Sequence, residues 1–275
     1  MNRVEEVTRA VVLARGLGTR MRRADTEAVV DPEQAAVAET GLKAMIPVGR
    51  PFLDFVLSGL ADAGFRDVCL VIGPEHGAVR ERYGRDLPLT RLRVHFAVQD
   101  SPLGTADAVL AAEAFAADSP FVVLNSDNYY PVQALAALRR RGAPALLGFD
   151  REGLIGGGNI DPERIARFAL LVTGPDGTLR RILEKPGEDM VRELGPHAPV
   201  SMNCWCFPPE IFAACRAIEP SERGELELPH AVQHAIDRAG MRFQVVPSDL
   251  PVLDMSSRGD IASVKEALRG VEVRL

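Results

Sequence analysis

Short apolar runs alternate with amphipathic segments along the first 150 residues of the chain. The apolar runs are rich in Val, Leu, Ile and Phe and are bounded by turn-forming residues, a pattern that predicts buried strands. Between them, apolar residues recur every three or four positions, which predicts helices; after Pro51, for example, Phe52, Phe55 and Leu60 would share one face. The expected strands are VVLA (11–14), DVCLVIG (67–73), RVHFAVQ (93–99), FVVLNSDNYY (121–130) and APALLGF (143–149).

Strand followed by helix, repeated along the chain, is the order that predicts an α/β fold. Such units build an open, mostly parallel, Rossmann-like sheet with helices on both faces. Ligands of these sheets bind at the carboxyl ends of the strands. The polar residues that directly follow the expected strands are therefore the first candidates for a functional site.

The pattern changes near residue 150. The further strands are expected within RFALLVTGPDGTLRRILEKP (167–186), as two strands around a Pro-Asp-Gly turn, and at VSMNCWCF (200–207), while GGGN (156–159) marks a loop. Helices are expected at 208–218, 226–240 and 258–270. We expect residues 1–150 and 151–275 to be two halves of a single domain that ends in a C-terminal helix.

Composition excludes several classes of function. The chain has 275 residues and a net charge of −6, which argues against general binding to nucleic acid or to anionic membranes. No apolar run approaches the roughly 20 residues of a membrane span, and the N-terminal MNRVEEVTRA lacks a signal-type segment, so we expect a cytoplasmic protein. The cysteines lack the spacing of a zinc site and are expected to be buried free thiols. They are Cys69, Cys204, Cys206 and Cys215.

The first strand ends in a glycine-rich turn, ARGLGTRMRR (14–23). Gly16 and Gly18 free the backbone for a tight turn and for close approach of a ligand, and the arginines that follow favour a phosphate anion. The dinucleotide fingerprint and the P-loop both fail, because Met21 stands where each needs glycine. An ordinary strand-to-helix turn with solvated arginines is the alternative interpretation of this stretch taken alone.

Lysine is scarce. It occurs only at positions 43, 185 and 265, so arginine supplies 29 of the 32 basic side chains. A retained lysine suggests a site that needs a compact ammonium group rather than a planar guanidinium. Lys43 and Lys185 lie in motif-like surroundings, whereas chance retention suffices for Lys265 in the expected C-terminal helix.

Six fragments together resemble the sugar-1-phosphate nucleotidylyltransferases. They are LARGLGTRM (13–21), KAMIPV (43–48), QDSPLGTADAV (99–109), LNSDN (124–128), EKP (184–186) and VLDMSS (252–257). The resemblance implies a glycosyltransferase-A-like nucleotidyltransferase core, with a nucleotide-binding first half and a sugar-phosphate-binding second half. It also implies transfer of a nucleotidyl group from an NTP to a sugar 1-phosphate, giving an NDP-sugar and pyrophosphate.

The resemblance also implies roles for individual residues. Nucleotide contacts fall to Leu13, Gly16, Gly18, Gln99, Gly104 and Asn125. Catalytic charge falls to Arg20, Lys43 and Lys185, sugar-phosphate contacts to Glu184, Lys185 and Asn203, and a Mg²⁺ ion to Asp127 and Asp254. Carboxylates with phosphate oxygens and waters suit Mg²⁺. The alternatives are turn or capping residues for Asp127 and Asp254 and a solvated charged pair for Glu184 and Lys185.

The base and the sugar are less tightly constrained. The amide of Gln99 can donate and accept at once, which matches uracil or thymine, so UTP or dTTP is favoured, although guanine also fits. Arg15 stands where the family usually has Ala or Gly, and MNCWCF (202–207) replaces a common sugar-side motif. Residues 24–41 enlarge the loop between Arg20 and Lys43 and are expected to form a short helix or a mobile lid.

Other functions compatible with the sequence are a GTP- or ATP-using transferase acting on an unusual sugar or cyclitol phosphate, a cytidylyltransferase or molybdenum-cofactor-type transferase with a similar glycine loop, and a catalytically weak regulatory protein that binds nucleotide sugars. Retention of both candidate metal ligands favours the active enzyme, because a sensor would not need them. The expected partners are an NTP and a sugar 1-phosphate, and a homo-oligomer is compatible with the chain.

Overall fold

The computed structural model describes residues 6–26 and 28–275, and within them ten strands form one mixed sheet. The strand order is β3-β2-β1-β4-β10-β6-β9-β7-β8, and β11 pairs with β6 outside this path. The four strands at one side are all parallel, as the sequence predicts. They are β3 (Arg93–Val98), β2 (Asp67–Ile72), β1 (Arg9–Leu13) and β4 (Phe121–Asn125).

The other side of the sheet mixes directions. Strand β10 runs antiparallel to both β4 and β6, whereas β11 runs parallel to β6. The hairpin β7–β8 forms around the predicted Pro-Asp-Gly turn and completes this side. The strands are β6 (Ala145–Phe149), β7 (Ala169–Thr173), β8 (Leu179–Leu183), β9 (Val200–Ser201), β10 (Trp205–Phe207) and β11 (Gln244–Ser248).

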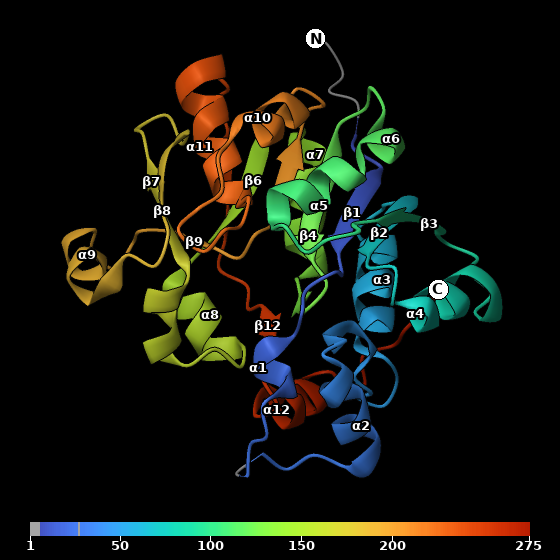
Figure 1. Ribbon diagram of the computed structural model, residues 1–275. Coiled ribbons are helices and arrows are strands. Elements are labelled where there is room, and N and C mark those ends of the chain that lie inside the picture. The colour runs from blue at the N-terminus through green and yellow to red at the C-terminus, as the bar shows by residue number, and fades with distance from the viewer. Residues whose placement is uncertain (1–5, 27) are drawn as a thin grey trace.

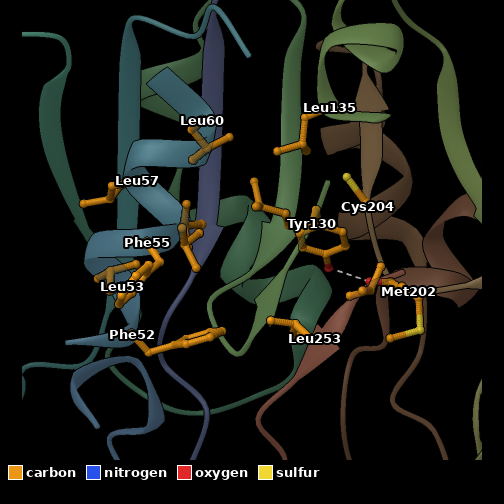
Figure 2. Packing of buried hydrophobic residues seen from close by; sticks show 14 of the residues in the cluster. Phe52, Leu53, Phe55, Leu57, Leu60, Tyr130, Leu135, Met202, Cys204 and Leu253 are labelled. Atoms are coloured by element: carbon orange, nitrogen blue, oxygen red, sulfur yellow. Dashed lines mark hydrogen bonds between the residues drawn. The ribbon is translucent and has the colours of Figure 1, made fainter. Parts of the chain in front are cut away.

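Helices cover both faces of the sheet (Figure 1). Alternate residues of the central strands enter two different apolar clusters: Val12 faces α3 and α7, whereas Val11 faces α5, α10 and α11. Figure 2 shows the first cluster, where α3 packs beside Tyr130 and Leu253. The covering helices are α3 (Phe52–Asp62), α7 (Val132–Arg141), α5 (Thr105–Ala111), α10 (Ile211–Ala217) and α11 (Leu228–Ala239).

The remaining elements are short and lie mostly at the strand ends and edges. The helices are α1 (Thr19–Arg22), α2 (Pro32–Thr40), α4 (Gly77–Glu81), α6 (Glu113–Ala116), α8 (Arg151–Gly157), α9 (Gly187–Glu193) and α12 (Asp260–Ala267). The 3-10 and π turns are η1 (Lys43–Met45), η2 (Arg82–Asp86) and η3 (Pro162–Arg167). A separate two-stranded ribbon joins β5 (Asn128–Tyr129) to β12 (Leu253–Asp254).

Three sequence predictions of local structure are wrong. The expected strand 121–130 ends at Asn125, and Asn128–Tyr129 pairs with β12 in the separate ribbon. The stretch 200–207 is not one strand, because Asn203 takes a left-handed conformation with φ of 56° and separates β9 from β10. The glycines at 156 and 157 do not form a loop but end the helix α8, which begins at the Asp150 N-cap. The four cysteines are free and buried, as expected, and Cys204 and Cys206 enter the same cluster.

The enlarged segment contains the short helix that its sequence allows. Helix α2 begins with a capping box between Asp31 and Gln34, and it ends at Gly41, which has φ of 77°. Ala38, a residue of this helix, is fully buried, so the helix packs on the domain. Whether the segment also acts as a lid stays a prediction. Among the described residues, no helix is both long and apolar enough to cross a membrane.

Candidate active site

A cavity of about 420 Å³ lies at the carboxyl ends of β1 and β4. The two strands pair in parallel with Leu13 opposite Asn125, so the loops that follow them leave the sheet at the same edge. The cavity brings together all the residues predicted to bind nucleotide and three of those predicted to carry charge. They are Leu13, Gly16, Gly18, Gln99, Gly104 and Asn125, with Arg20, Lys43 and Asp127.

The glycine turn is fastened to the end of the enlarged segment. Gly18 has φ of 58°, and a Cβ there would lie 2.1 Å from the carbonyl oxygen of Gly41. A Cβ on Gly41 would in turn lie 2.5 Å from the oxygen of Leu17. Glycine is therefore required at both positions by a backbone-to-backbone contact. This contact, together with hydrogen bonds from Arg22 to the Thr40 carbonyl, fixes where Lys43 enters the cavity.

Lys43 and Asp127 form an ion pair inside the cavity, with 2.8 Å between Nζ and Oδ2. Both side chains are mostly enclosed. Burial alone would lower the pKa of Lys43, but the carboxylates of Asp127 and Asp254 outweigh it and raise the pKa above its usual value. The ammonium group therefore stays charged where a phosphate would bind.

Asp254 lies close to this pair but is held by other donors. Its carboxylate accepts hydrogen bonds from Asn128 at 3.0 Å and Ser256 at 2.8 Å, and it pairs with Arg164. Burial and repulsion from Asp127 raise the pKa of Asp254 to about 6. The carboxylates of Asp127 and Asp254 therefore lie close enough to repel each other, although the two residues are far apart in the sequence.

Arg164 is a site residue that the sequence does not reveal. Its guanidinium joins Asp254 to Asp260, with 2.8 Å between Arg164 Nη1 and Asp260 Oδ1. It lies in the polar η3 segment, and in a chain with 29 arginines its residue type carries no signal. Asn128 and Asn159, which hold the side chain and backbone of Asp254, were also missed.

The two carboxylates fit a divalent cation in chemical type. They are hard oxygen donors, and their mutual repulsion is what a cation would relieve. Among the described residues, no group of three or more His, Cys, Asp or Glu is arranged to hold a metal, so phosphate and water would have to complete the coordination. Lys43 and Arg164 now neutralise Asp127 and Asp254, and a cation would take over part of that role.

The far end of the cavity is organised around Gln99. Its amide nitrogen donates to the Gly104 carbonyl at 3.0 Å and to the Asp107 carboxylate at 2.7 Å. Arg15 donates from Nε to the backbone carbonyl of Gln99 at 3.1 Å and pairs with Glu75 at 2.8 Å. Arg15, the unusual residue of the glycine turn, is therefore buried and braces the strand end that carries Gln99.

The predicted sugar-side residues are not in this cavity. Glu184 and Lys185 line a separate cavity of about 390 Å³, beside His230 and Gln233. Lys185 has φ of 43° and is exposed. The two lysines to which the resemblance assigns catalytic charge therefore line different cavities: Lys43 lies beside the central glycine turn, whereas Lys185 follows β8 at the sheet edge.

Asn203 lies between these regions in the sheet order. It separates β9 from β10, and its backbone N–H donates to the Ser201 hydroxyl at 3.3 Å. Its neighbour Met202 accepts a hydrogen bond from the Tyr130 hydroxyl at 2.5 Å, the dashed line in Figure 2. Since Tyr130 follows the Asp127 loop, this bond ties the Asn203 turn to the loop that carries the candidate metal ligand.

Comparison with known proteins identifies the family to which the chain belongs. Residues 36–250 match the family model described as nucleotidyl transferase. The chain belongs to this family. The match begins within the enlarged segment, so the glycine turn lies outside the matched residues.

Two curated relatives and one solved structure are similar to the chain. It is 34% identical over 236 residues to a glucose-1-phosphate thymidylyltransferase of Streptomyces antibioticus, covering 83% of this chain but only 57% of the relative. It is 27% identical over 264 residues to the UTP–glucose-1-phosphate uridylyltransferase AglF of Haloferax volcanii, covering 94% of this chain and 96% of the relative. The inositol-1-phosphate CTP transferase from T. maritima has the same fold, with a TM-score of 0.70, 16% identity, and coverage of 97% of this chain and 98% of that one.

Proposed function

We propose that this protein transfers a nucleotidyl group from an NTP, UTP or dTTP being favoured, to a sugar 1-phosphate. The observation that carries the proposal is the single cavity that gathers the glycine turn, the Lys43–Asp127 pair and Gln99 at one edge of the sheet. The two curated relatives, which are named as thymidylyl- and uridylyltransferases, support the reaction class.

In the proposed reaction an oxygen of the sugar phosphate attacks the α-phosphorus of the NTP. A new P–O bond forms, the bond between the α-phosphorus and the bridging oxygen to the β-phosphate breaks, and pyrophosphate leaves with the electron pair. The chain need only align the two substrates and neutralise charge. Lys43 would neutralise charge near the α-phosphate, and Arg20 would hold the departing pyrophosphate.

Asp127 and Asp254 are the residues that would hold Mg²⁺. When bound, the ion supplies a Lewis acid that neutralises phosphate oxygens. Lys43 donates to Asp127 and so holds that carboxylate in the cavity, while Arg164, Asn128 and Ser256 orient Asp254. These hydrogen bonds and ion pairs hold both carboxylates in place before any ligand binds.

Glu184, Lys185 and Asn203 remain the proposed contacts to the sugar phosphate. Their separation from the nucleotide cavity means that the sugar phosphate would have to bridge the two regions, or that the β7–β8 hairpin moves when it binds. The cytoplasmic location and any homo-oligomer likewise stay predictions from the sequence.

The test is a screen of purified protein for pyrophosphate release, with the NDP-sugar identified by mass. UTP, dTTP, CTP, GTP and ATP are each paired with hexose 1-phosphates, amino-sugar 1-phosphates and inositol 1-phosphate. The proposal expects product with UTP or dTTP and a sugar 1-phosphate. Binding of nucleotide sugars without turnover in every pair would instead support the regulatory function, and product with inositol 1-phosphate alone would support the cyclitol alternative.

A further inference from the structure

The orientation of the Gln99 amide is fixed by the chain itself. Its nitrogen has two hydrogens, and the structure supplies one acceptor for each: the Gly104 carbonyl at 3.0 Å and the Asp107 carboxylate at 2.7 Å. A backbone carbonyl and an ionised carboxylate accept hydrogen bonds but cannot donate them. Turning the amide over would place its oxygen against two acceptors, so only one orientation is favourable.

The amide oxygen of Gln99 is left for a ligand. No described residue donates to Oε1, although Gln99 is only 4% exposed and lines the nucleotide cavity. Because this oxygen has no protein donor among the described residues and belongs to a residue that lines the cavity, a bound ligand that donates an N–H at this point gains a hydrogen bond. The cavity therefore offers one fixed acceptor at its base-binding end.

The backbone of Gln99 is held as firmly as its side chain. Its N–H donates to the Ile72 carbonyl at 2.9 Å, and its own carbonyl accepts from Arg15 at 3.1 Å. Asp107 lies in the first turn of α5, which packs on the central strands. The acceptor can therefore neither turn over nor move away from a base that does not suit it.

We propose that Asp107 is a positioning residue that sets base selectivity, by holding the Gln99 amide with its oxygen toward the base. This inference rests on the proposed function and names the substrate class within it. Uracil, thymine and guanine carry a ring N–H on their pairing edge and can donate to the oxygen. Cytosine and adenine carry a ring nitrogen acceptor there and meet an acceptor instead.

Selection by such a local contact is consistent with the fold comparison. A protein named as a CTP transferase has the same fold as this chain, at a TM-score of 0.70. The fold alone therefore does not decide which base is used, and side chains at the cavity end must do so.

The test compares Asp107→Asn with Asp100→Asn. Asparagine keeps the size of Asp107 but can donate to a turned-over amide oxygen, so cytosine and adenine should become better tolerated. Asp100 is exposed and follows Gln99 directly, and within residues 28–275 no hydrogen bond joins it to the Gln99 amide, so its variant removes the same charge without touching the contact. The readout is the ratio of kcat/KM for UTP to that for CTP, with Asp107→Ser as a second variant and melting temperature as a check of folding.

We expect wild-type protein to favour UTP and Asp107→Asn to lower the UTP-to-CTP ratio by about tenfold, the scale of one hydrogen bond to a charged group. Asp100→Asn should leave the ratio within about twofold. An unchanged ratio in both Asp107 variants would overturn the inference, and so would an equal loss with both nucleotides, which a merely structural role predicts. If no sugar phosphate gives product, the proposed function fails, but calorimetric binding of UTP and CTP to the same variants still decides the role of Asp107.

Discussion

The proposed nucleotide side and the proposed sugar side of this protein, the cavities lined by Gln99 and by Lys185, are built in different ways. On the nucleotide side, β1 and β4 are buried, parallel and in register, and the residues that follow them meet in one cavity. On the sugar side, Glu184 and Lys185 follow β8, the terminal strand of the sheet path, and line a cavity of their own. The same chain thus holds one group of predicted site residues together and leaves the other apart.

The difference follows from where the strands lie. A central parallel strand is fixed by neighbours on both edges and by helices on both faces, so its carboxyl end has a single position. The edge hairpin β7–β8 pairs through β7 with β9, and its other side is held by the Thr178–Gln244 bridge and by hydrogen bonds with Gln233 of α11, while residues such as Arg180 and Arg181 are exposed. We infer that the nucleotide site is preformed, whereas the sugar-phosphate site is completed when substrate binds.

The largest expected loss of activity comes from removing the carboxylate of Asp127 on the proposed nucleotide side. Asp127→Asn should lower kcat by at least ~10²-fold, the range expected for loss of one strong electrostatic stabiliser. Asp118→Asn, in the exposed turn that precedes β4, is the matched control and should keep full activity. EDTA should abolish activity as well; an unimpaired Asp127→Asn enzyme, or full activity in EDTA, would contradict the assignment of the metal site.

A second change tests whether the nucleotide side is preformed by the contact between the glycine turn and the enlarged segment. Gly18→Ala adds a Cβ 2.1 Å from the Gly41 oxygen at a positive φ, and should lower the free energy of unfolding by about 1–3 kcal/mol. Gly77→Ala is the control, because a Cβ there has no atom within 4 Å. Denaturant unfolding measures both, and equal stability of the two variants would show that the contact does not shape the turn.

The central strands were predictable because each is an unbroken apolar run bounded by turn residues, and the site residues Gln99, Asn125 and Asp127 follow those runs directly. A parallel sheet brings such strand ends together without further information. Lys43 was singled out by the scarcity of lysine and by its motif position, and it lines the cavity at this edge, where it pairs with Asp127; its role in catalysis stays a prediction.

Other features of the fold could not be predicted from the amino-acid sequence. The break at Asn203 lies inside an apolar run, where this residue in the left-handed conformation separates β9, which pairs with β6 and β7, from β10, which pairs with β4 and β6. Insertion of β10 between β4 and β6 joins residues about 80 positions apart in sequence, which local periodicity does not encode. The position of Lys185 outside the cavity of Lys43 could not be predicted either, because it depends on where the β7–β8 hairpin joins the sheet.

Substitution of Lys43 and Lys185 tests the difference between the two proposed sides, with smaller expected effects. Lys43→Arg should lower kcat by about tenfold, on the scale of one charged hydrogen bond, because a planar fork does not fit where the ammonium meets Asp127. Lys185→Arg should instead raise the KM for sugar 1-phosphate more than that for NTP.

The third lysine serves as the control for this pair. Lys265, on α12, is half exposed and lies 3.8 Å from Asp31, so Lys265→Arg should keep wild-type parameters. Steady-state kinetics of the three variants decides the matter. Wild-type parameters in both Lys43→Arg and Lys185→Arg would show that lysine scarcity is an accident of composition.

The smallest expected effect concerns the enlarged segment. Val29 is 84% exposed, ahead of α2, and elastase should cleave after it. If residues 24–41 close over bound nucleotide, UTP with Mg²⁺ should slow this cleavage several-fold. The exposed Val271 near the C-terminus is an internal control, whose cleavage should not change. Equal cleavage at Val29 with and without nucleotide would remove the segment from the mechanism.

The most direct test of the whole account follows the phosphorus of the sugar phosphate. Purified protein is given UTP or dTTP, Mg²⁺ and glucose 1-phosphate labelled with ³²P, and the products are separated. The account predicts that the label appears only in the NDP-sugar, as its second phosphate, while an equal amount of unlabelled pyrophosphate is released. Label in pyrophosphate or in free phosphate, or label that stays in the sugar phosphate with every sugar tried, would contradict it.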